Sequence, residues 1–147
     1  MPTRIRIATP EQVAIARKAV QERADALGFG TLERTKFVTA VSELARNTVV
    51  HGGGGEMTVR QVVNNGRIGL QVEFEDKGPG IAEISLAMRD GFTTANSLGL
   101  GLGGAKRLVS EFAITSTPGA GTHVKIVQWN NSVRIHPATH STFRSQL

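Results

Sequence analysis

Three short motifs in a fixed order most constrain what this chain folds into. They are Glu43-Leu44-Ala45-Arg46-Asn47, Asp76-Lys77-Gly78-Pro79-Gly80 and Gly99-Leu100-Gly101-Leu102-Gly103-Gly104. The first places a carboxylate and a carboxamide four residues apart in a helical pattern, so both side chains share one helix face. The second is an acid before a glycine turn, and the third is a glycine run that opens into another helical pattern. A base, an oxygen ligand for a hard cation and flexible backbone at a helix N-terminus are the parts that hold a nucleoside triphosphate.

Length and composition bound the class of protein. The 147 residues are enough for one domain with a hydrophobic core. The chain has no cysteine, which excludes a disulfide framework and a thiolate metal site. No apolar run approaches the roughly 18–20 residues needed to cross a bilayer, and residues 1–6 lack the apolar stretch of a signal peptide. We therefore expect a cytoplasmic protein with no membrane partner.

The charge is mildly basic, with 17 Lys and Arg against 12 Asp and Glu, which gives a formal net charge of +5. Nucleic-acid binding needs a dense basic patch, usually with aromatic residues to stack on bases. Here the basic residues are scattered and aromatic residues make up only 5% of the chain. We expect no nucleic-acid partner, and a mildly basic surface also suits ATP and an acidic protein partner.

Periodicity and turn signals predict an α+β fold. Alternating apolar residues indicate strands over residues 3–8, 57–63, 67–75, 113–117 and 122–129. Helical spacing and caps indicate helices from Thr9-Pro10 to Gly28, from a Thr31 cap to about His51, and over residues 82–89 and 102–112. Asn64-Asn65-Gly66 predicts a hairpin turn. We expect a two-layer sandwich, with helices on one face of a mostly antiparallel, mixed sheet.

The expected domain covers residues 1–129. Residues 130–147 have weak periodicity and no acid, and they form a C-terminal extension of unknown role. This extension is either a terminal strand with a mobile end or an unfolded tail.

The pair Glu43 and Asn47 gives the clearest candidate for chemistry. If this helix face lines a pocket, the amide oxygen of Asn47 is a ligand for Mg²⁺. The carboxylate of Glu43 can then accept a proton from an attacking hydroxyl. The alternative interpretation is a solvated helix face, which is the common fate of polar residues at this spacing.

The two glycine motifs complete the expected nucleotide site. Asp76, at a strand end, is expected to accept a hydrogen bond from the adenine amino group, while Gly78 and Gly80 let the ring lie against backbone. Backbone N–H groups of the run from Gly99 are expected to bind phosphates, with the preceding loop as a mobile lid. The chain has neither a Rossmann fingerprint at its first strand–helix junction nor a Walker pattern.

The ordered motifs resemble the Bergerat-fold ATP-binding superfamily, also called GHKL, which includes gyrase and histidine kinases. A narrower resemblance is to the RsbT-type serine/threonine kinases of the bacterial stressosome, which are relatives of the anti-sigma-factor kinases. The segments that carry it, within residues 3–129, are Glu43-Leu-Ala-Arg-Asn47, Asp76-Lys-Gly-Pro-Gly-Ile81, Asp90-Gly-Phe-Thr-Thr94, Ser97-Leu-Gly-Leu-Gly-Leu102, Lys106-Arg-Leu and Gly121-Thr122.

This resemblance implies a role for each matching residue. Glu43 is the expected general base and Asn47 the Mg²⁺ ligand, while Asp76 reads adenine. The other residues that the resemblance assigns to nucleotide binding are Gly78, Gly80, Ile81, Gly99, Leu100, Gly101, Leu102 and Thr122, the last supporting the adenine end through Asp76 or water. The second glycine after Leu102, Gly104, departs from the usual pattern and indicates a looser lid.

The implied function is Mg²⁺-ATP-dependent phosphorylation of Ser or Thr on STAS-domain partner proteins, within a stress-signalling partner-switching module. Members of this family also bind and activate a downstream effector, such as a phosphatase or another output enzyme. Two rival interpretations stay open. One is a non-catalytic, ATP-gated binding module such as an anti-sigma factor, and the other is a plain ATPase without a protein acceptor.

Overall fold

The structure is a computed structural model that describes residues 2–81, 88 and 101–134. Its strands form one sheet in the spatial order β1-β2-β3-β5-β4, and all four described pairings are antiparallel. The strands are β1 (Thr3–Ile7), β2 (Gly55–Asn64), β3 (Arg67–Asp76), β4 (Glu111–Thr117) and β5 (Gly121–Arg134). Strand β3 therefore lies in the centre of the sheet, and its last residue is the predicted site residue Asp76.

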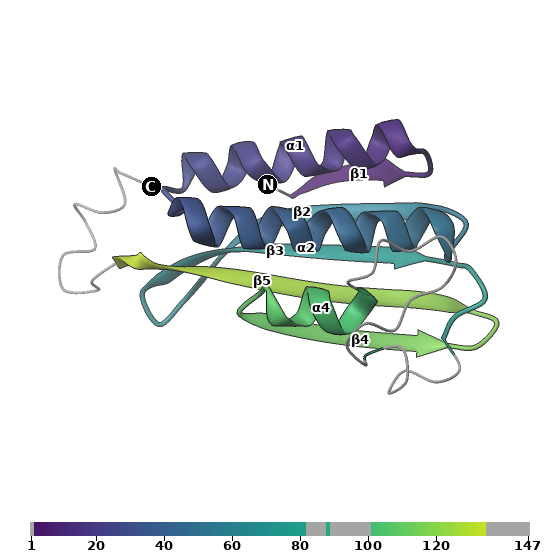
Figure 1. The fold of residues 1–147 in the computed structure, drawn as a ribbon. Coiled ribbons are helices and arrows are strands. Elements are labelled where there is room, and N and C mark those ends of the chain that lie inside the picture. The colour runs from purple at the N-terminus through teal and green to yellow at the C-terminus, as the bar shows by residue number, and fades with distance from the viewer. Residues whose placement is uncertain (1, 82–87, 89–100, 135–147) are drawn as a thin grey trace.

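Helices α1 (Pro10–Ala26), α2 (Thr31–Val50) and α4 (Gly101–Arg107) lie along one face of this sheet (Figure 1). Alternate residues of the strands and one side of each helix make a single core between the two layers. On β3 these inward residues are Ile68, Leu70, Val72 and Phe74. The predicted α+β class with helices on one face is confirmed.

Helix α1 begins and ends where the sequence predicts. The Thr9 hydroxyl accepts a hydrogen bond from the backbone N–H of Gln12, and Pro10 occupies the first helical position. Gly28 follows the helix with a φ of 76°, a conformation that glycine adopts without strain. The helix buries Ala16, Val20 and Ala24 against the core.

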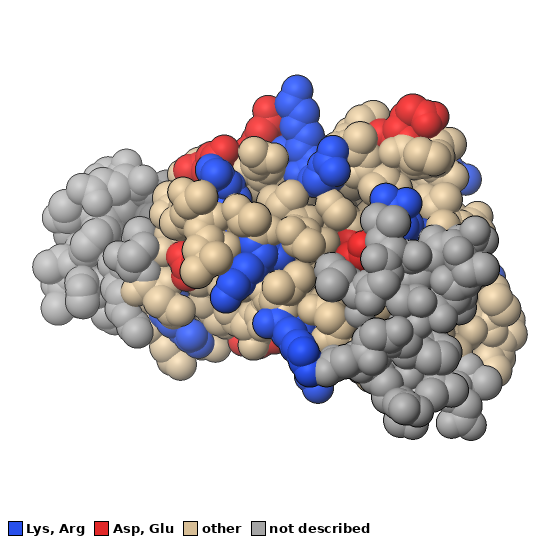
Figure 2. All heavy atoms as spheres, in the orientation of Figure 1, with Lys and Arg blue, Asp and Glu red and all other residues tan. Residues whose placement is uncertain are grey.

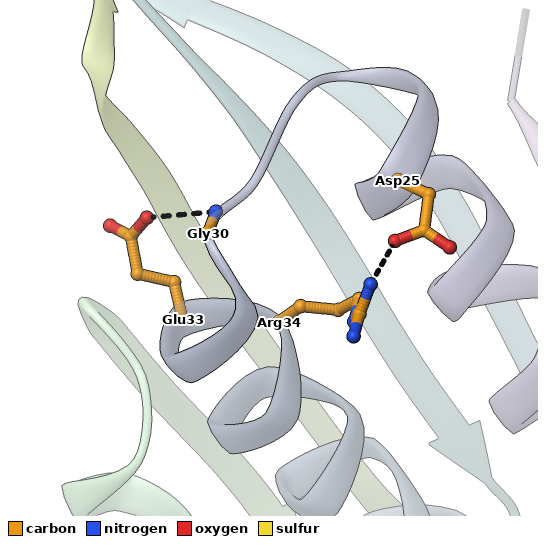
Figure 3. Close-up of polar contacts among 4 residues, drawn as sticks. All are labelled: Asp25, Gly30, Glu33 and Arg34. Carbon is orange, nitrogen blue, oxygen red and sulfur yellow. Dashed lines mark hydrogen bonds and ion pairs between the residues drawn. The ribbon is translucent and has the colours of Figure 1, made fainter.

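The predicted start of α2 is wrong by one residue. Gly30, and not Thr31, is the N-cap, and the carboxylate of Glu33 accepts a hydrogen bond from the Gly30 backbone N–H (Figure 3). Arg34 also forms an ion pair with Asp25 of α1 at this corner. Because the Glu33 side chain bonds to the N-cap backbone, the helix does not need the Thr31 hydroxyl as a cap, and Thr31 is its first residue.

The β2–β3 hairpin is confirmed, with a shorter turn than predicted. Asn64 is still paired in β2, and the two turn residues are Asn65 and Gly66. Both have positive φ, at 52° and 77°, as a type I′ turn requires.

The predicted helix over residues 102–112 is too long. Helix α4 ends at Arg107, and Phe112 belongs to β4, where it pairs with Ile126. The edge of β5 offers backbone partners to residues 111–117, and this pairing overrides the helical spacing of the apolar residues. The predicted helix over residues 82–89 and the glycine loop before Gly101 lie outside the described residues, apart from Met88.

Strand β5 continues to Arg134, past the predicted end at Trp129, because β3 pairs with it as far as Arg67. On the sheet face away from the helices, Trp129 lies opposite Gly69. The Arg67 guanidinium lies 4.6 Å from the centroid of the Trp129 ring, and the indole N–H donates to Glu111 at 2.7 Å. Trp129 is therefore only 6% exposed, although none of the described helices covers this face.

We expect Gly69→Ala to lower the free energy of unfolding by about 1–3 kcal/mol, the usual cost of overpacking. A Cβ atom at Gly69 would lie 2.7 Å from Cε3 of Trp129 and 2.9 Å from the backbone oxygen of Gln128. Urea denaturation followed by Trp129 fluorescence measures the change. The control is Gly53→Ala, where the added Cβ meets nothing within 4 Å and the φ of 74° leaves backbone strain as the only cost. Trp129 emission in the native protein should change in Gly69→Ala and stay unchanged in Gly53→Ala; unchanged emission in Gly69→Ala would contradict the packing argument.

On the face drawn in Figure 2, the basic side chains stand apart from one another, with acidic and uncharged residues between them. Among the residues that the structure describes, no helix combines the length and the apolar character that a membrane span requires.

Candidate nucleotide-binding and phosphoryl-transfer site

The site gathers where β3 ends, β5 begins and α2 gives way to a glycine loop. Asp76 and Thr122 are opposite each other across the β3–β5 ladder. The backbone oxygen of Asn47 accepts hydrogen bonds from the N–H groups of His51 and Gly52, which closes the end of α2. Asp76 and Thr122 therefore lie at the same end of their strands. The loop after Asn47 brings the C-terminal end of α2 next to them.

The carboxylate of Asp76 lies against glycine backbone. One oxygen, Oδ1, accepts a hydrogen bond of 2.9 Å from the Gly78 N–H. A Cβ atom at Gly52 would lie 2.4 Å from the carboxylate carbon of Asp76, and one at Gly78 would lie 2.6 Å from the Gly52 backbone oxygen. Only glycines allow this approach, so the loop after α2 and the Asp76 motif form one glycine-lined cradle.

The sequence prediction treated the glycines after α2 only as the end of the helix. Their contact with Asp76 was missed because residues 52 and 76 are far apart in the chain, and no local pattern reports their proximity.

The second half of the Asp76 motif is fixed to the β4–β5 hairpin. Gly80 has a φ of 75°, and a Cβ atom there would lie 2.4 Å from the Thr117 backbone oxygen. The Ile81 N–H donates to the Ser116 hydroxyl at 2.8 Å, and the Pro79 oxygen accepts from the Gly119 N–H at 2.7 Å. These contacts hold the loop that follows Asp76 in one position.

Ser116 is a site residue that the sequence reasoning missed. Its hydroxyl lies 2.8 Å from the Thr122 hydroxyl and 3.1 Å from the Gly121 backbone oxygen, in addition to its bond from Ile81. Ser116 thus connects Thr122 to the Asp76 loop. A signal was available, because a hairpin closed at Thr117 and Gly121 places Ser116 directly opposite Thr122.

Glu43 is the buried acid of the site. Its side chain is only 5% exposed, and its Oε2 atom is buried without a hydrogen-bond partner. Burial raises the pKa of this carboxyl above the ordinary value of 4.5, while the nearby positive charge of Arg46 opposes the rise. A carboxylate that is dehydrated and unpaired is a strong proton acceptor, which is the property of a general base.

Asn47 lies one turn after Glu43 on α2 and is half-buried. Its amide oxygen belongs to the donor class that Mg²⁺ prefers, so the residue fits the predicted metal-ligand role. The Asp76 carboxylate likewise offers acceptor oxygens, which recognition of an adenine amino group requires. The described side chains thus suit Mg²⁺ and ATP, and the individual roles of Glu43, Asn47 and Asp76 stay predictions.

The last motif is described only in part. Gly101 begins α4 with a φ of 65°, and Leu102 is buried in the core where α4 packs against α2. The predicted phosphate-binding residues Gly99 and Leu100 lie outside the described residues. The described end of this motif is therefore held by the packing of Leu102 in the core.

Comparison with known proteins decides the family. The family model described as "Histidine kinase-like ATPase domain" matches residues 7–128. The chain belongs to the histidine kinase-like ATPase family. Within this family it is homologous to the serine/threonine-protein kinase RsbT of Bacillus subtilis, with 42% identity over 125 residues, which cover 85% of the chain and 94% of that protein. An anti-sigma F factor of a Thermoanaerobacter species is 31% identical over 125 residues, covering 81% of the chain and 86% of that protein.

Two solved structures share this fold. The RsbU and RsbW domains of Rv1364c from Mycobacterium tuberculosis superpose with a TM-score of 0.61 at 22% identity, over 92% of the chain and about a third (34%) of that longer chain. The mycobacterial sensor histidine kinase MprB superposes with a TM-score of 0.51 at 20% identity, over 88% and 97% of the two chains. At these identities the likeness establishes the fold alone. ATP binding is implied by the family of the chain.

Proposed function

We propose that this protein is a Mg²⁺-ATP-dependent serine/threonine kinase and switch protein of a bacterial stress-signalling module. Its substrates are STAS-domain partner proteins, and it also binds a downstream effector such as a phosphatase. A cytoplasmic location is part of the same proposal, because ATP is the phosphoryl donor. The observation that supports this most is the 42% identity to RsbT across nearly the whole of both proteins.

Within this proposal each described side chain has a physical task. Glu43, which is buried and whose Oε2 atom has no hydrogen-bond partner, accepts the proton of the acceptor Ser or Thr hydroxyl. Asp76, with one oxygen already bonded to the Gly78 N–H, presents its remaining acceptor capacity to the adenine amino group. Ser116 and Thr122 support this end of the pocket. Asn47 holds Mg²⁺, which when bound neutralises charge on the phosphate oxygens.

The direct test is transfer of labelled γ-phosphate from Mg²⁺-ATP to STAS-domain proteins encoded near this one. We expect label on a Ser or Thr of the STAS protein. Phosphate release without label on any protein would instead indicate a plain ATPase.

A second function has its own support, since anti-sigma F factors are relatives at about 30% identity. In that alternative the protein is a non-catalytic module whose affinity for a sigma factor depends on bound ATP. Tight ATP binding without transfer, together with capture of a sigma factor in place of a STAS protein, would favour it.

We expect Asp76→Asn to weaken ATP binding by about 10- to 100-fold, the range for a lost hydrogen bond to a charged group. The substitution replaces one acceptor oxygen with an NH₂ donor that faces the adenine amino group. Calorimetric titration with ATP measures the change. The control is Glu75→Gln, one residue earlier and well exposed, which should bind ATP like wild type. An Asp76→Asn protein with wild-type affinity would remove Asp76 from the adenine site.

A further inference from the structure

Arg46 is a cation beside the site, and the phosphoryl transfer proposed above does not use it. It lies on α2 between Glu43 and Asn47, is half-buried, and its Nε atom is buried without a hydrogen-bond partner. Three other arginines among the described residues have a contact that occupies the guanidinium. Arg34 bonds to Asp25, Arg23 donates to the Thr3 hydroxyl, and Arg67 lies over the Trp129 ring.

A buried donor without a partner destabilises a folded protein, and the cost is larger for a charged group. Native proteins therefore keep few such groups, and each one calls for a reason. Arg46 is a long side chain that reaches solvent easily from a helix surface. Its buried, unpaired Nε–H indicates that the folded protein reserves this donor for a group absent from the protein itself.

Glu43 is a group of opposite charge that interacts with Arg46. Glu43 lies one turn before Arg46 on α2. Burial raises the pKa of the Glu43 carboxyl, and the positive charge of the guanidinium lowers it. Even so, Glu43 Oε2 is also buried and unpaired, so the two unpaired atoms do not bond to each other. One helix face thus offers a free acceptor for a hydroxyl and, one turn away, a free cationic donor for an anion.

Building on the proposed function, we propose that Arg46 binds the terminal phosphate of the nucleotide and that its Nε–H becomes paired only in the nucleotide-bound protein. A guanidinium matches a phosphate in charge and in the geometry of its donors, and it forms hydrogen bonds that an ammonium group reproduces only in part. Under the proposed function the phosphates of Mg²⁺-ATP lie beside Asn47, which follows Arg46 directly on α2. Arg46 is then a binding residue that distinguishes ATP from ADP.

The test compares wild type, Arg46→Met and Arg46→Lys by calorimetric titration with ADP and with the β,γ-imido analogue of ATP, both with Mg²⁺. We expect Arg46→Met to weaken binding of the ATP analogue by about tenfold or more, with a smaller change for ADP. Arg46→Lys should restore part of the difference. In the nucleotide-free protein the Tm of Arg46→Met should equal or exceed that of wild type, because the substitution removes an unpaired buried donor.

Lys36→Met is the matched control, since it removes one positive charge from an exposed position on the same helix. It should discriminate between the two nucleotides as wild type does. Equal weakening of both nucleotides in Arg46→Met, with a lower Tm, would show a structural role and overturn the proposal. Unchanged nucleotide affinities with an altered pH profile of transfer would show that Arg46 only positions Glu43, and would also overturn it.

The same titrations separate this proposal from the function on which it rests. Wild-type protein that binds neither nucleotide would overturn the proposed function, and the role of Arg46 with it. Wild-type protein that prefers the ATP analogue, beside an Arg46→Met protein with the same preference, would overturn the role of Arg46 alone.

Discussion

Glu43→Gln is expected to lower phosphoryl transfer to the protein acceptor by about 10²- to 10⁴-fold, the range for removal of a general base. Glutamine keeps the size of the side chain and its place on α2, but its amide cannot accept the proton of the attacking hydroxyl. Binding of ATP should be unchanged, because the proposed contacts to adenine and to Mg²⁺ come from Asp76 and Asn47. Transfer of labelled γ-phosphate and calorimetric titration measure the two properties separately.

The matched control for this variant is Glu33→Gln, the same substitution at the start of the same helix. Glu33 caps Gly30 through one oxygen atom, which glutamine also provides. Its transfer rate should therefore equal that of wild type. Full transfer activity in Glu43→Gln would remove Glu43 as the base, and equal loss of ATP binding and transfer would make it a binding residue.

The raised pKa of Glu43 also predicts how the nucleotide-free protein responds to pH. Between the ordinary value of 4.5 and the raised pKa, the folded protein holds a proton that the unfolded chain has released. The contribution of Glu43 to stability is therefore fully present below 4.5 and is lost as the pH rises through the folded-state pKa. Glu43→Gln lacks this loss, so we expect it to become more stable relative to wild type as the pH rises through that window. Urea denaturation at several pH values measures the difference, and a difference independent of pH would contradict the assigned burial.

Gly121→Ala is expected to lower the free energy of unfolding by at least about 4 kcal/mol, a loss that single substitutions rarely cause. Gly121 begins β5 with a φ of 122°, and a Cβ atom there would lie 2.1 Å from the backbone oxygen of Asp76. Asp76 pairs with Thr122 of β5, and Gly121 pairs with Thr117 of β4, so neither backbone can move aside without breaking a strand pairing. Thermal and urea denaturation measure the loss.

Gly119→Ala, in the same turn, separates the two causes of this effect. Gly119 also has a positive φ, 81°, but an added Cβ atom meets nothing within 4 Å. It should therefore show only the backbone strain of a non-glycine residue, about 1–2 kcal/mol. A loss in Gly121→Ala no larger than that in Gly119→Ala would mean that the strand ends at Asp76 are not held as tightly as the structure indicates.

Much of the fold was predictable because it depends on near neighbours in the sequence. The Thr9-Pro10 start of α1, its end at Gly28 and the Asn65-Gly66 turn each follow from the backbone preferences of one or two residues. The alternation along β3 predicted its buried face correctly. The predicted helix and strand boundaries are wrong where pairing with a segment distant in the sequence determines the secondary structure. Pairing with β5 places Phe112 in a strand although its spacing is helical, and β5 runs past Trp129 because β3 continues beside it.

The sequence by itself determined the order of the motifs, and through it the family, because nucleotide chemistry requires these residue types in these local settings. It also determined that Glu43 and Asn47 share one side of a helix, since that follows from 3.6 residues per turn. Only the tertiary structure decided that Glu43 is buried with its Oε2 atom unpartnered, that Gly52 lies against the Asp76 carboxylate, and that Ser116 connects Thr122 to Ile81. These contacts join segments far apart in the chain. They depend on the register of the sheet and on how the helices pack against it, which no local pattern specifies.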